Sequence, residues 1–86
     1  MNHIVTLHRA GHEPEPVLVY SLPEASEAVL AYQRKHGMAS SDMGEHHGDV
    51  TTHGVMTHDV SYNGRVWGMD DEGDYCVLEH EPTNID

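Results

Sequence analysis

The segment SLPEASEAVLAYQRKHG, residues 21–37, carries the signals for the start, the body and the end of a helix. Ser21 and Glu24 form a capping box, in which a hydroxyl and a carboxylate satisfy backbone amides at a helix start. Gly37 suits the left-handed conformation that follows many helices. The apolar residues between them recur at helical spacing: Leu22, Ala25, Ala28, Val29 and Tyr32. One amphipathic helix is predicted here, and the rest of the chain must cover its apolar side.

Two strands are predicted before this helix. Residues 3–8 are rich in β-branched side chains, and residues 17–20 read Val-Leu-Val-Tyr, a composition typical of strands. Residues 12–16 lie between them and include two prolines. Proline has no N–H to donate, so we expect residues 12–16 to lie outside the sheet. The two strands are expected to pair in an antiparallel manner.

The chain after the helix predicts further strands. Residues 38–48 show no usable period and are predicted as a loop. Strand-like residues follow at 49–52, 55–62, 65–69 and 75–78. The resulting fold class is α+β, with one helix packed on a small antiparallel or mixed sheet in the order β-β-α-β-β-β.

Asn63-Gly64 is the strongest hairpin signal, because a type I′ turn needs positive φ at both central residues. A two-residue loop would fix which residues of the two strands are opposite each other: Tyr62 with Arg65, Val60 with Trp67, and His58 with Met69. The side chains of all six would then lie on the same side of the sheet as Met56. We expect this side to face the core, since the alternate positions 57, 59 and 61 are polar.

Length and composition indicate a single domain, residues 1–86, with a frayed tail at residues 79–86. The chain has no Phe and 37% hydrophobic residues, so its core is small, and a homodimer that buries more apolar surface would help stability. Cys76 is the sole cysteine, so no intrachain disulfide can form and a reducing compartment fits best. No apolar run approaches the roughly 20 residues that cross a bilayer. We therefore expect a cytoplasmic protein without membrane contact.

Charge is the most unusual feature of the sequence. Fifteen Asp and Glu stand against four Lys and Arg, which gives a formal net charge of −11. Such a surface repels phosphate, so direct binding to nucleic acid or anionic lipid is excluded as a main function. The favoured partner is a basic surface. Solubility alone, or adaptation to high salt, would also explain the charge.

The acidic residues nearest the predicted last hairpin are the main candidates for contact with a basic partner. They are Asp70, Asp71, Glu72 and Asp74, with Glu79, Glu81, Glu13 and Glu15 behind them. The first four lack the twelve-residue ligand spacing of a calcium loop, so they are interpreted as a solvated acidic turn.

Histidines give an alternative site. The densest group of metal-ligand residue types is Glu45, His46, His47, Asp49 and His53, of which the two adjacent histidines, Asp49 and His53 are the candidate ligands. Zinc would accept these ligands, but neither the paired spacing of structural zinc sites nor an H-E-x-x-H helix occurs. No metal and no cofactor is therefore predicted, and a histidine-rich metal-binding protein remains an alternative.

No catalytic residue is predicted. Cys76, beside Val77 and Leu78 in a predicted strand, is interpreted as a small core residue rather than a nucleophile. The G-x-S-x-G elbow, the P-loop and the dinucleotide fingerprint are all missing from the sequence. The chain is therefore predicted not to be an enzyme.

Residues 23–67, about half of the chain, resemble a group of small proteins encoded by bacteriophages and mobile elements. The likeness rests on Glu-Ala-Ser-Glu-Ala-Val, residues 24–29, and especially on Val-Ser-Tyr-Asn-Gly-Arg-Val-Trp, residues 60–67. These motifs describe a helix face and a hairpin, so they imply fold more than activity, and no site residue is carried over. In size, acidity and lack of a catalytic motif, the chain also resembles anti-CRISPR proteins, many of which occupy nucleic-acid channels of CRISPR effector complexes.

The leading hypothesis is a non-enzymatic, phage-encoded inhibitor of the anti-CRISPR type in the host cytosol. Its carboxylates would block the basic, nucleic-acid-binding surface of a host protein or complex, a CRISPR effector being the suspected partner. The alternatives are the histidine-rich metal-binding protein and a structural or assembly protein of a phage.

Overall fold

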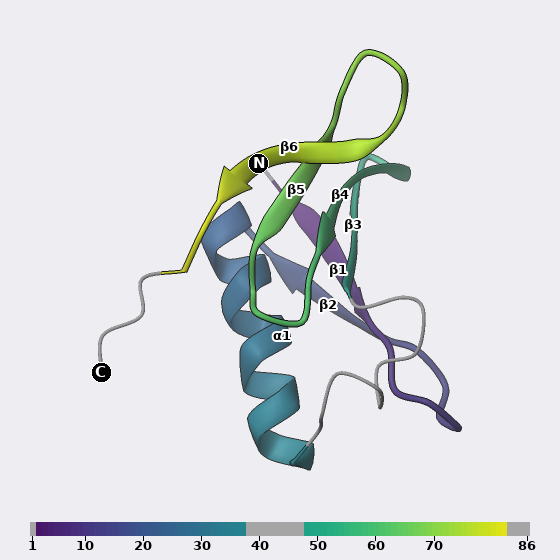
Figure 1. Ribbon diagram of the computed structural model, residues 1–86. Helices are drawn as coiled ribbons and strands as arrows, with labels where there is room; N and C mark the ends of the chain where they lie inside the picture. The colour runs from purple at the N-terminus through teal and green to yellow at the C-terminus, as the bar shows by residue number, and fades with distance from the viewer. Residues whose placement is uncertain (1, 38–47, 83–86) are drawn as a thin grey trace.

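One helix packs against one face of an antiparallel sheet in the computed structural model, which describes residues 2–37 and 48–82 (Figure 1). The elements in chain order are β1 His3–Leu7, β2 Glu15–Val19, α1 Leu22–His36, β3 Gly48–Thr52, β4 Val55–Val60, β5 Val66–Met69 and β6 Tyr75–His80. The six strands lie in the spatial order β2-β1-β3-β4-β5-β6. The α+β class is thereby confirmed. The order contains one strand more than predicted, because β3 and β4 are separate strands.

Both ends of α1 follow the prediction from sequence. The Ser21 hydroxyl accepts a hydrogen bond from the Glu24 amide at 3.3 Å, and the Glu24 carboxylate accepts one from the Tyr20 amide at 2.6 Å. Gly37 ends the helix in the left-handed conformation, with φ of 59°. These caps satisfy backbone groups that a helix end leaves without partners, so local sequence alone determines where α1 begins and ends.

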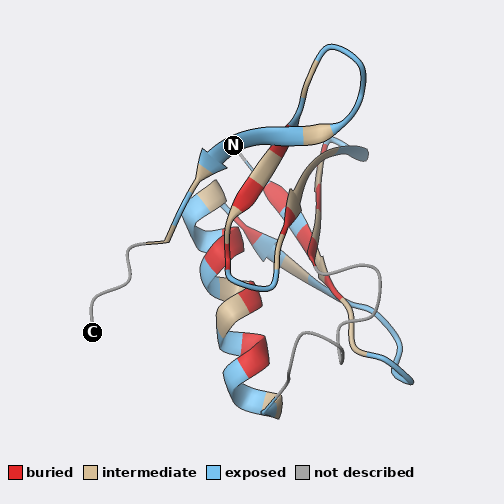
Figure 2. Cartoon of the chain, in the orientation of Figure 1, coloured by how far each residue is buried: buried red, intermediate tan, exposed pale blue. Residues whose placement is uncertain are grey.

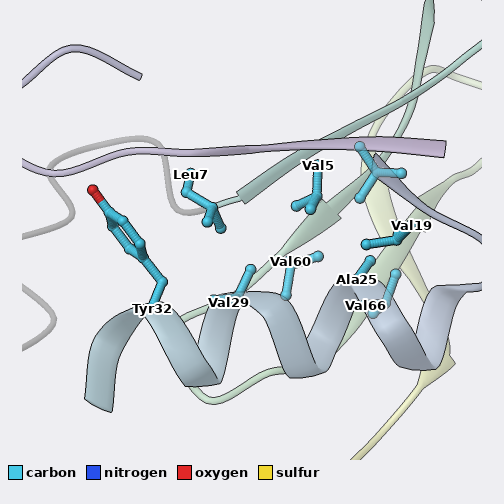
Figure 3. Close-up of a cluster of buried hydrophobic side chains, with 9 residues drawn as sticks. Val5, Leu7, Val19, Ala25, Val29, Tyr32, Val60 and Val66 are labelled. Carbon is cyan, nitrogen blue, oxygen red and sulfur yellow. The ribbon is translucent and has the colours of Figure 1, made fainter. Parts of the chain in front are cut away.

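The core lies between α1 and the face of the sheet that α1 covers (Figures 2 and 3). Its buried hydrophobic residues are Val5, Leu7, Val19, Ala25, Val29, Tyr32, Val50, Val60 and Val66. Six of the nine are valine or leucine from the strands, and they meet a helix side formed by the other three, Ala25, Val29 and Tyr32. Each buried valine contributes about 1.5–3 kcal/mol relative to exposure, so this one cluster carries most of the stability.

The prediction that residues 12–16 lie outside the sheet is wrong for Glu15 and Pro16. Both belong to β2, where Pro16 is opposite Thr6 of β1. β2 is an edge strand and has a neighbour on one side only. Proline is tolerated at such an edge because its missing N–H need not take part in the ladder.

The predicted type I′ turn occurs in the structure, but at a different hairpin. Thr52 pairs with Val55, and the two residues between them, His53 and Gly54, have φ of 54° and 78°. Two consecutive positive φ values are the mark of a type I′ turn. Histidine is among the non-glycine residues that adopt this region more readily than most.

The Asn63-Gly64 hairpin has a three-residue loop instead, so the predicted register is wrong by one residue. The Ser61 amide bonds to the Arg65 carbonyl at 2.9 Å, and Val60 pairs with Val66. A shift of one residue moves every second side chain to the other face of the sheet. Val60 is on the core side as predicted, whereas Trp67 pairs with Asp59 on the opposite side. Met56, also predicted to face the core, is exposed.

The loop of this hairpin rests on α1. The Ser26 hydroxyl donates to the Gly64 carbonyl at 2.6 Å, and the Gln33 side-chain amide donates to the Tyr62 carbonyl at 2.7 Å. Two turns of the helix thus hold the loop through its backbone. Residues 60–67, on which the phage-protein resemblance mainly rests, therefore belong to the β4–β5 hairpin, whose loop is tied to the helix.

The far end of the chain is more ordered than predicted. Glu79 and His80 belong to β6, which pairs with β5, instead of to a frayed tail. The remaining tail positions 83–86 lie outside the described residues. Within residues 2–37 and 48–82, no helix is long and apolar enough to cross a membrane.

Candidate binding surfaces

The acidic turn between β5 and β6, residues 70–74, brings most of the predicted contact residues together. The carboxylate oxygens of Asp70, Glu72 and Asp74 all lie within 4.8 Å of one another, and Asp71 adjoins them in sequence. Residues 71–74 are exposed. Figure 1 shows this turn projecting from one end of the sheet. The arrangement concentrates negative charge at a protruding tip.

Asp70 differs from its neighbours because its carboxylate folds the turn. Its Oδ1 accepts hydrogen bonds from the amides of Glu72 and Asp74, both at 2.9 Å. Its Oδ2 accepts one from the Cys76 thiol at 3.1 Å. Hydrogen bonds from the Asp74 amide and the Cys76 thiol are the main reasons that the pKa of Asp70 is lowered. Asp70 therefore shapes the turn, while residues 71, 72 and 74 are available to a partner.

Cys76 is exposed, which corrects its interpretation as a core residue. β6 is the other edge strand, so its side chains meet less of the core than those of inner strands. The hydrogen bond to Asp70 raises the pKa of the Cys76 thiol, because a thiolate would face a carboxylate. A raised pKa disfavours the reactive thiolate form.

The other predicted contact residues do not join the acidic turn. Glu79 bonds to the His58 ring at 2.9 Å, and Glu81 bonds to Arg65 at 3.3 Å. Glu13 and Glu15 lie at the hairpin of β1 and β2, at the opposite end of the sheet from the turn (Figure 1). The acidic residues of the turn and those of the hairpin therefore form two separate groups.

Several of the few cations are occupied by neighbours within the chain. Arg34 bonds to Glu27 at 2.7 Å, and Arg65 bonds to Glu81. Arg9 donates to the ring nitrogens of His36 at 2.9 Å and of His12 at 3.2 Å. Two of the four cations are thus paired with carboxylates, and Arg9 contacts histidine rings instead of the acidic turn.

The metal alternative finds no support in the described residues. His46 and His47 lie outside them. Asp49, in β3, bonds to the His8 ring at 2.8 Å, whereas His53 belongs to the turn at the other end of that strand. Among residues 2–37 and 48–82, the acidic turn is the sole group with metal-ligand spacing, and it contains no histidine.

A chain of polar side chains crosses the sheet and was not foreseen from sequence. Its members are joined by hydrogen bonds of 2.7–3.0 Å: His3 to Thr52, Thr52 to Thr57, Thr57 to His58, and His58 to Glu79. The residues come from four strands, so no local motif could reveal them. His3 and Thr52 are buried. Their hydrogen bonds satisfy polar groups that would otherwise be costly inside the protein.

The second surface missed by sequence analysis is the face of the sheet opposite α1, here called the open face. Ile4 and Leu18 are direct cross-strand neighbours on it and are 44% and 53% exposed. Asp49 and Asp59 are also direct neighbours on this face. A sheet face in contact with water is usually polar along its whole length. This one mixes large apolar side chains with carboxylates, a combination typical of interaction surfaces.

Comparison of the sequence with family models and curated proteins, and of the fold with solved structures, gave no match.

Proposed function

We propose that this chain is a non-enzymatic acidic binding protein that occupies the basic, nucleic-acid-binding surface of another protein. The suspected partner is a CRISPR effector complex, which would make the chain an anti-CRISPR-type inhibitor. The acidic turn is the observation that carries the proposal, because it presents three exposed acidic residues at a projecting tip.

The physical basis is competition for the same cations. A groove that binds nucleic acid is lined with Lys and Arg, and a dense group of carboxylates attracts those residues as phosphates do. The net charge of −11 adds long-range attraction toward a basic partner. Attraction between exposed charges falls as salt is added, so binding of this kind weakens at high ionic strength.

The proposal is tested by capturing partners from the lysate of a bacterium with CRISPR systems, at about 50 mM and about 500 mM salt, where screening differs strongly. Bound proteins are identified by mass spectrometry. DNA binding by the captured complex is then measured with increasing amounts of the chain. We expect a nucleic-acid-binding complex to be captured mainly at low salt and its DNA binding to be inhibited in a one-to-one ratio.

Two variants with the same net charge locate the contact. Asp71→Asn, Glu72→Gln and Asp74→Asn together remove three charges from the acidic turn and leave Asp70 to fold it. Glu13→Gln, Glu15→Gln and Glu27→Gln remove three charges elsewhere. We expect the first variant to lose inhibition by at least about tenfold and the second to retain most of it. Equal loss in both, or inhibition that is insensitive to salt, would contradict the proposal.

A further inference from the structure

The polar chain that crosses the sheet has a single direction of hydrogen bonding. At one end, the ionised carboxylate of Glu79 only accepts, so the His58 Nε2, 2.9 Å away, carries a proton and donates it. A neutral imidazole has one donor nitrogen and one acceptor nitrogen. The His58 Nδ1 is then the acceptor, and the Thr57 hydroxyl donates to it at 2.9 Å. Glu79 thus determines the role of the next hydroxyl in the chain.

The same rule assigns the donors in the rest of the chain. Thr57 has given its one hydroxyl proton to His58, so its oxygen accepts from the Thr52 hydroxyl at 3.0 Å. The Thr52 oxygen in turn accepts from the His3 Nδ1 at 2.7 Å. His3 must therefore carry its proton on Nδ1 while His58 is neutral. A carboxylate in β6 determines the tautomer of a buried ring in β1.

A proton added to His58 reverses the hydrogen bonds between the two rings. A protonated His58 Nδ1 donates to the Thr57 oxygen, so the Thr57 hydroxyl proton needs another acceptor. The Thr52 oxygen, at 3.0 Å, is a better acceptor than the Val50 carbonyl, at 3.4 Å. Thr52 then donates to the His3 Nδ1, and His3 must hold its proton on Nε2. The charge of His58 and the tautomer of His3 are thereby linked.

The positions of the ring nitrogens decide where a proton enters. Both nitrogens of His58 are occupied, Nδ1 by Thr57 and Nε2 by Glu79. In the part of the chain that the structure describes, the His3 Nε2 has no hydrogen-bond partner. Water can therefore give a proton to the chain at the His3 Nε2, although the charge itself is better placed elsewhere.

The surroundings of the two rings favour charge on His58. Burial is the main cause that lowers the pKa of His3, and the charges of the N-terminus, His58 and His53 lower it further. The ring of His58 faces the carboxylate of Glu79 instead. A single positive charge on the chain therefore collects at the end that contacts β6.

We propose that the polar chain is a proton relay, which takes up a proton at His3 and delivers the charge to His58 beside Glu79 of β6. Water protonates the His3 Nε2, and the His3 Nδ1 proton passes to the Thr52 oxygen. The Thr52 proton passes to Thr57, and the Thr57 proton passes to the His58 Nδ1. One proton enters and one imidazolium forms, as the two distinct nitrogens of histidine permit. Because β6 follows the acidic turn, acidification would fasten the strand that anchors this turn.

The relay is tested by the ring-nitrogen NMR signals of the intact wild-type protein, from about pH 8 to about pH 5, the range in which histidine titrates. These signals distinguish the two neutral tautomers and the charged ring. Spectra of His3→Gln and His58→Gln identify the signals of each ring. We expect His3 to change from the Nδ1–H to the Nε2–H tautomer over the same pH interval in which His58 gains its proton.

A variant without the central hydroxyl separates the relay from independent titration of the two rings. Thr57→Val keeps the branched shape of the side chain and breaks the chain in the middle. The tautomer of His3 should then no longer follow the charge of His58. Thr6→Val, also in a strand but outside the polar chain, is the control and should leave the link intact. Thermal unfolding checks that each variant is folded.

Hydrogen exchange measures the effect on β6. The protection of its amides is compared between about pH 7.5 and about pH 5.5, after correction for the intrinsic effect of pH, in the wild type and in Glu79→Gln. We expect acidification to raise protection about two- to fivefold more in the wild type, as for a partly exposed ion pair.

Three results would overturn the inference. The first is a His3 ring that keeps its Nδ1 proton while His58 is charged, which would mean that Thr57 donates to the Val50 carbonyl. The second is a link between the two rings that survives in Thr57→Val. The third is an equal response of β6 to acidification in the wild type and in Glu79→Gln.

Discussion

Gly64 determines both the shape of the loop between β4 and β5 and the contact of that loop with α1. Its φ is 86°, in the region that favours glycine, and its carbonyl accepts the hydrogen bond from Ser26. A Cβ at this position would lie 3.0 Å from both the Leu30 Cδ1 and the Ser26 Oγ. Glycine is therefore required here for two reasons, the turn and the close approach of α1.

Gly64→Ala should lower the free energy of unfolding by about 2–4 kcal/mol, because left-handed strain and crowding add. Gly73→Ala is the matched control. Gly73 also has positive φ, 88°, but a Cβ there meets nothing within 4 Å. Gly73→Ala should lower the free energy of unfolding by the left-handed strain alone, about 1–2 kcal/mol. Urea unfolding measures both, and equal costs would show that the hairpin loop does not press on α1.

His3 links stability to pH. Burial is the main cause that lowers its pKa, followed by the charge of the N-terminus and the nearby His58 and His53. The unfolded chain then binds a proton at higher pH than the folded chain. The contribution of His3 is therefore present above its ordinary value of about 6.5 and is lost as pH falls through the lowered folded value.

The measurement for His3 is the difference in unfolding temperature between the wild type and His3→Gln at several pH values. The change in net charge on acidification affects both proteins in the same way. We expect the wild type to lose stability relative to the variant between pH 7.5 and pH 5, across the titration window of about 6.5 and below. A difference that stays constant over this range would contradict the argument.

At the scale of elements, β6 is held to the sheet through more than its pairing with β5. The Glu79 carboxylate reaches across β5 to the ring of His58 in β4. Gly68 of β5 makes this reach possible, because a Cβ there would overlap the Glu79 Oε2. The absence of one side chain on β5 thus allows a contact between strands that are not neighbours.

Gly68→Ala should displace the Glu79 side chain and lower stability by about 1 kcal/mol, since the atom in the way is the end of a flexible side chain in a partly exposed ion pair. The test is a double-mutant cycle with Glu79→Ala. We expect Gly68→Ala to cost much less when Glu79 is already alanine. Additive costs would mean that the glycine is needed for the backbone of β5 instead.

Elements with local signals were predictable, and contacts between elements were not. The ends of α1 follow from Ser21, Glu24 and Gly37, which act on their own backbone. The hairpin loops could not be assigned, because Asn63-Gly64 suits both a two-residue and a three-residue loop. The docking of the loop on Ser26 and Gln33 favours the longer one, and that contact spans more than 25 positions of the chain.

The candidate surfaces show the same contrast between features set by neighbouring residues and features set by contacts between distant strands. Residues 70–74 adjoin in sequence, so their clustering was foreseeable. The direct pairing of Asp49 with Asp59 depends on the register of β3 and β4, which contains an irregularity after Val50. Trp67 was placed on the wrong face by the one-residue error in its hairpin. A surface assembled from three strands therefore needed the structure.

For the whole molecule, the sheet separates two kinds of surface. One face is covered by α1 and contains the core, and the other bears apolar side chains and carboxylates on adjacent rows. The acidic turn lies elsewhere, between β5 and β6. Exposed negative charge is therefore concentrated at this protruding turn, whereas Asp49 on the uncovered face is bonded to the His8 ring.

The two edges of the sheet are unlike, and this difference limits how copies of the chain can assemble. β2 contains Pro16, which lacks a donor, and it is flanked by Glu13. β6 contains no proline. Growth of a fibre by strand addition requires two receptive edges on every molecule, whereas one receptive edge joins two molecules and then stops. The proline in β2 thus removes one backbone donor from that edge, which disfavours the addition of a further strand there.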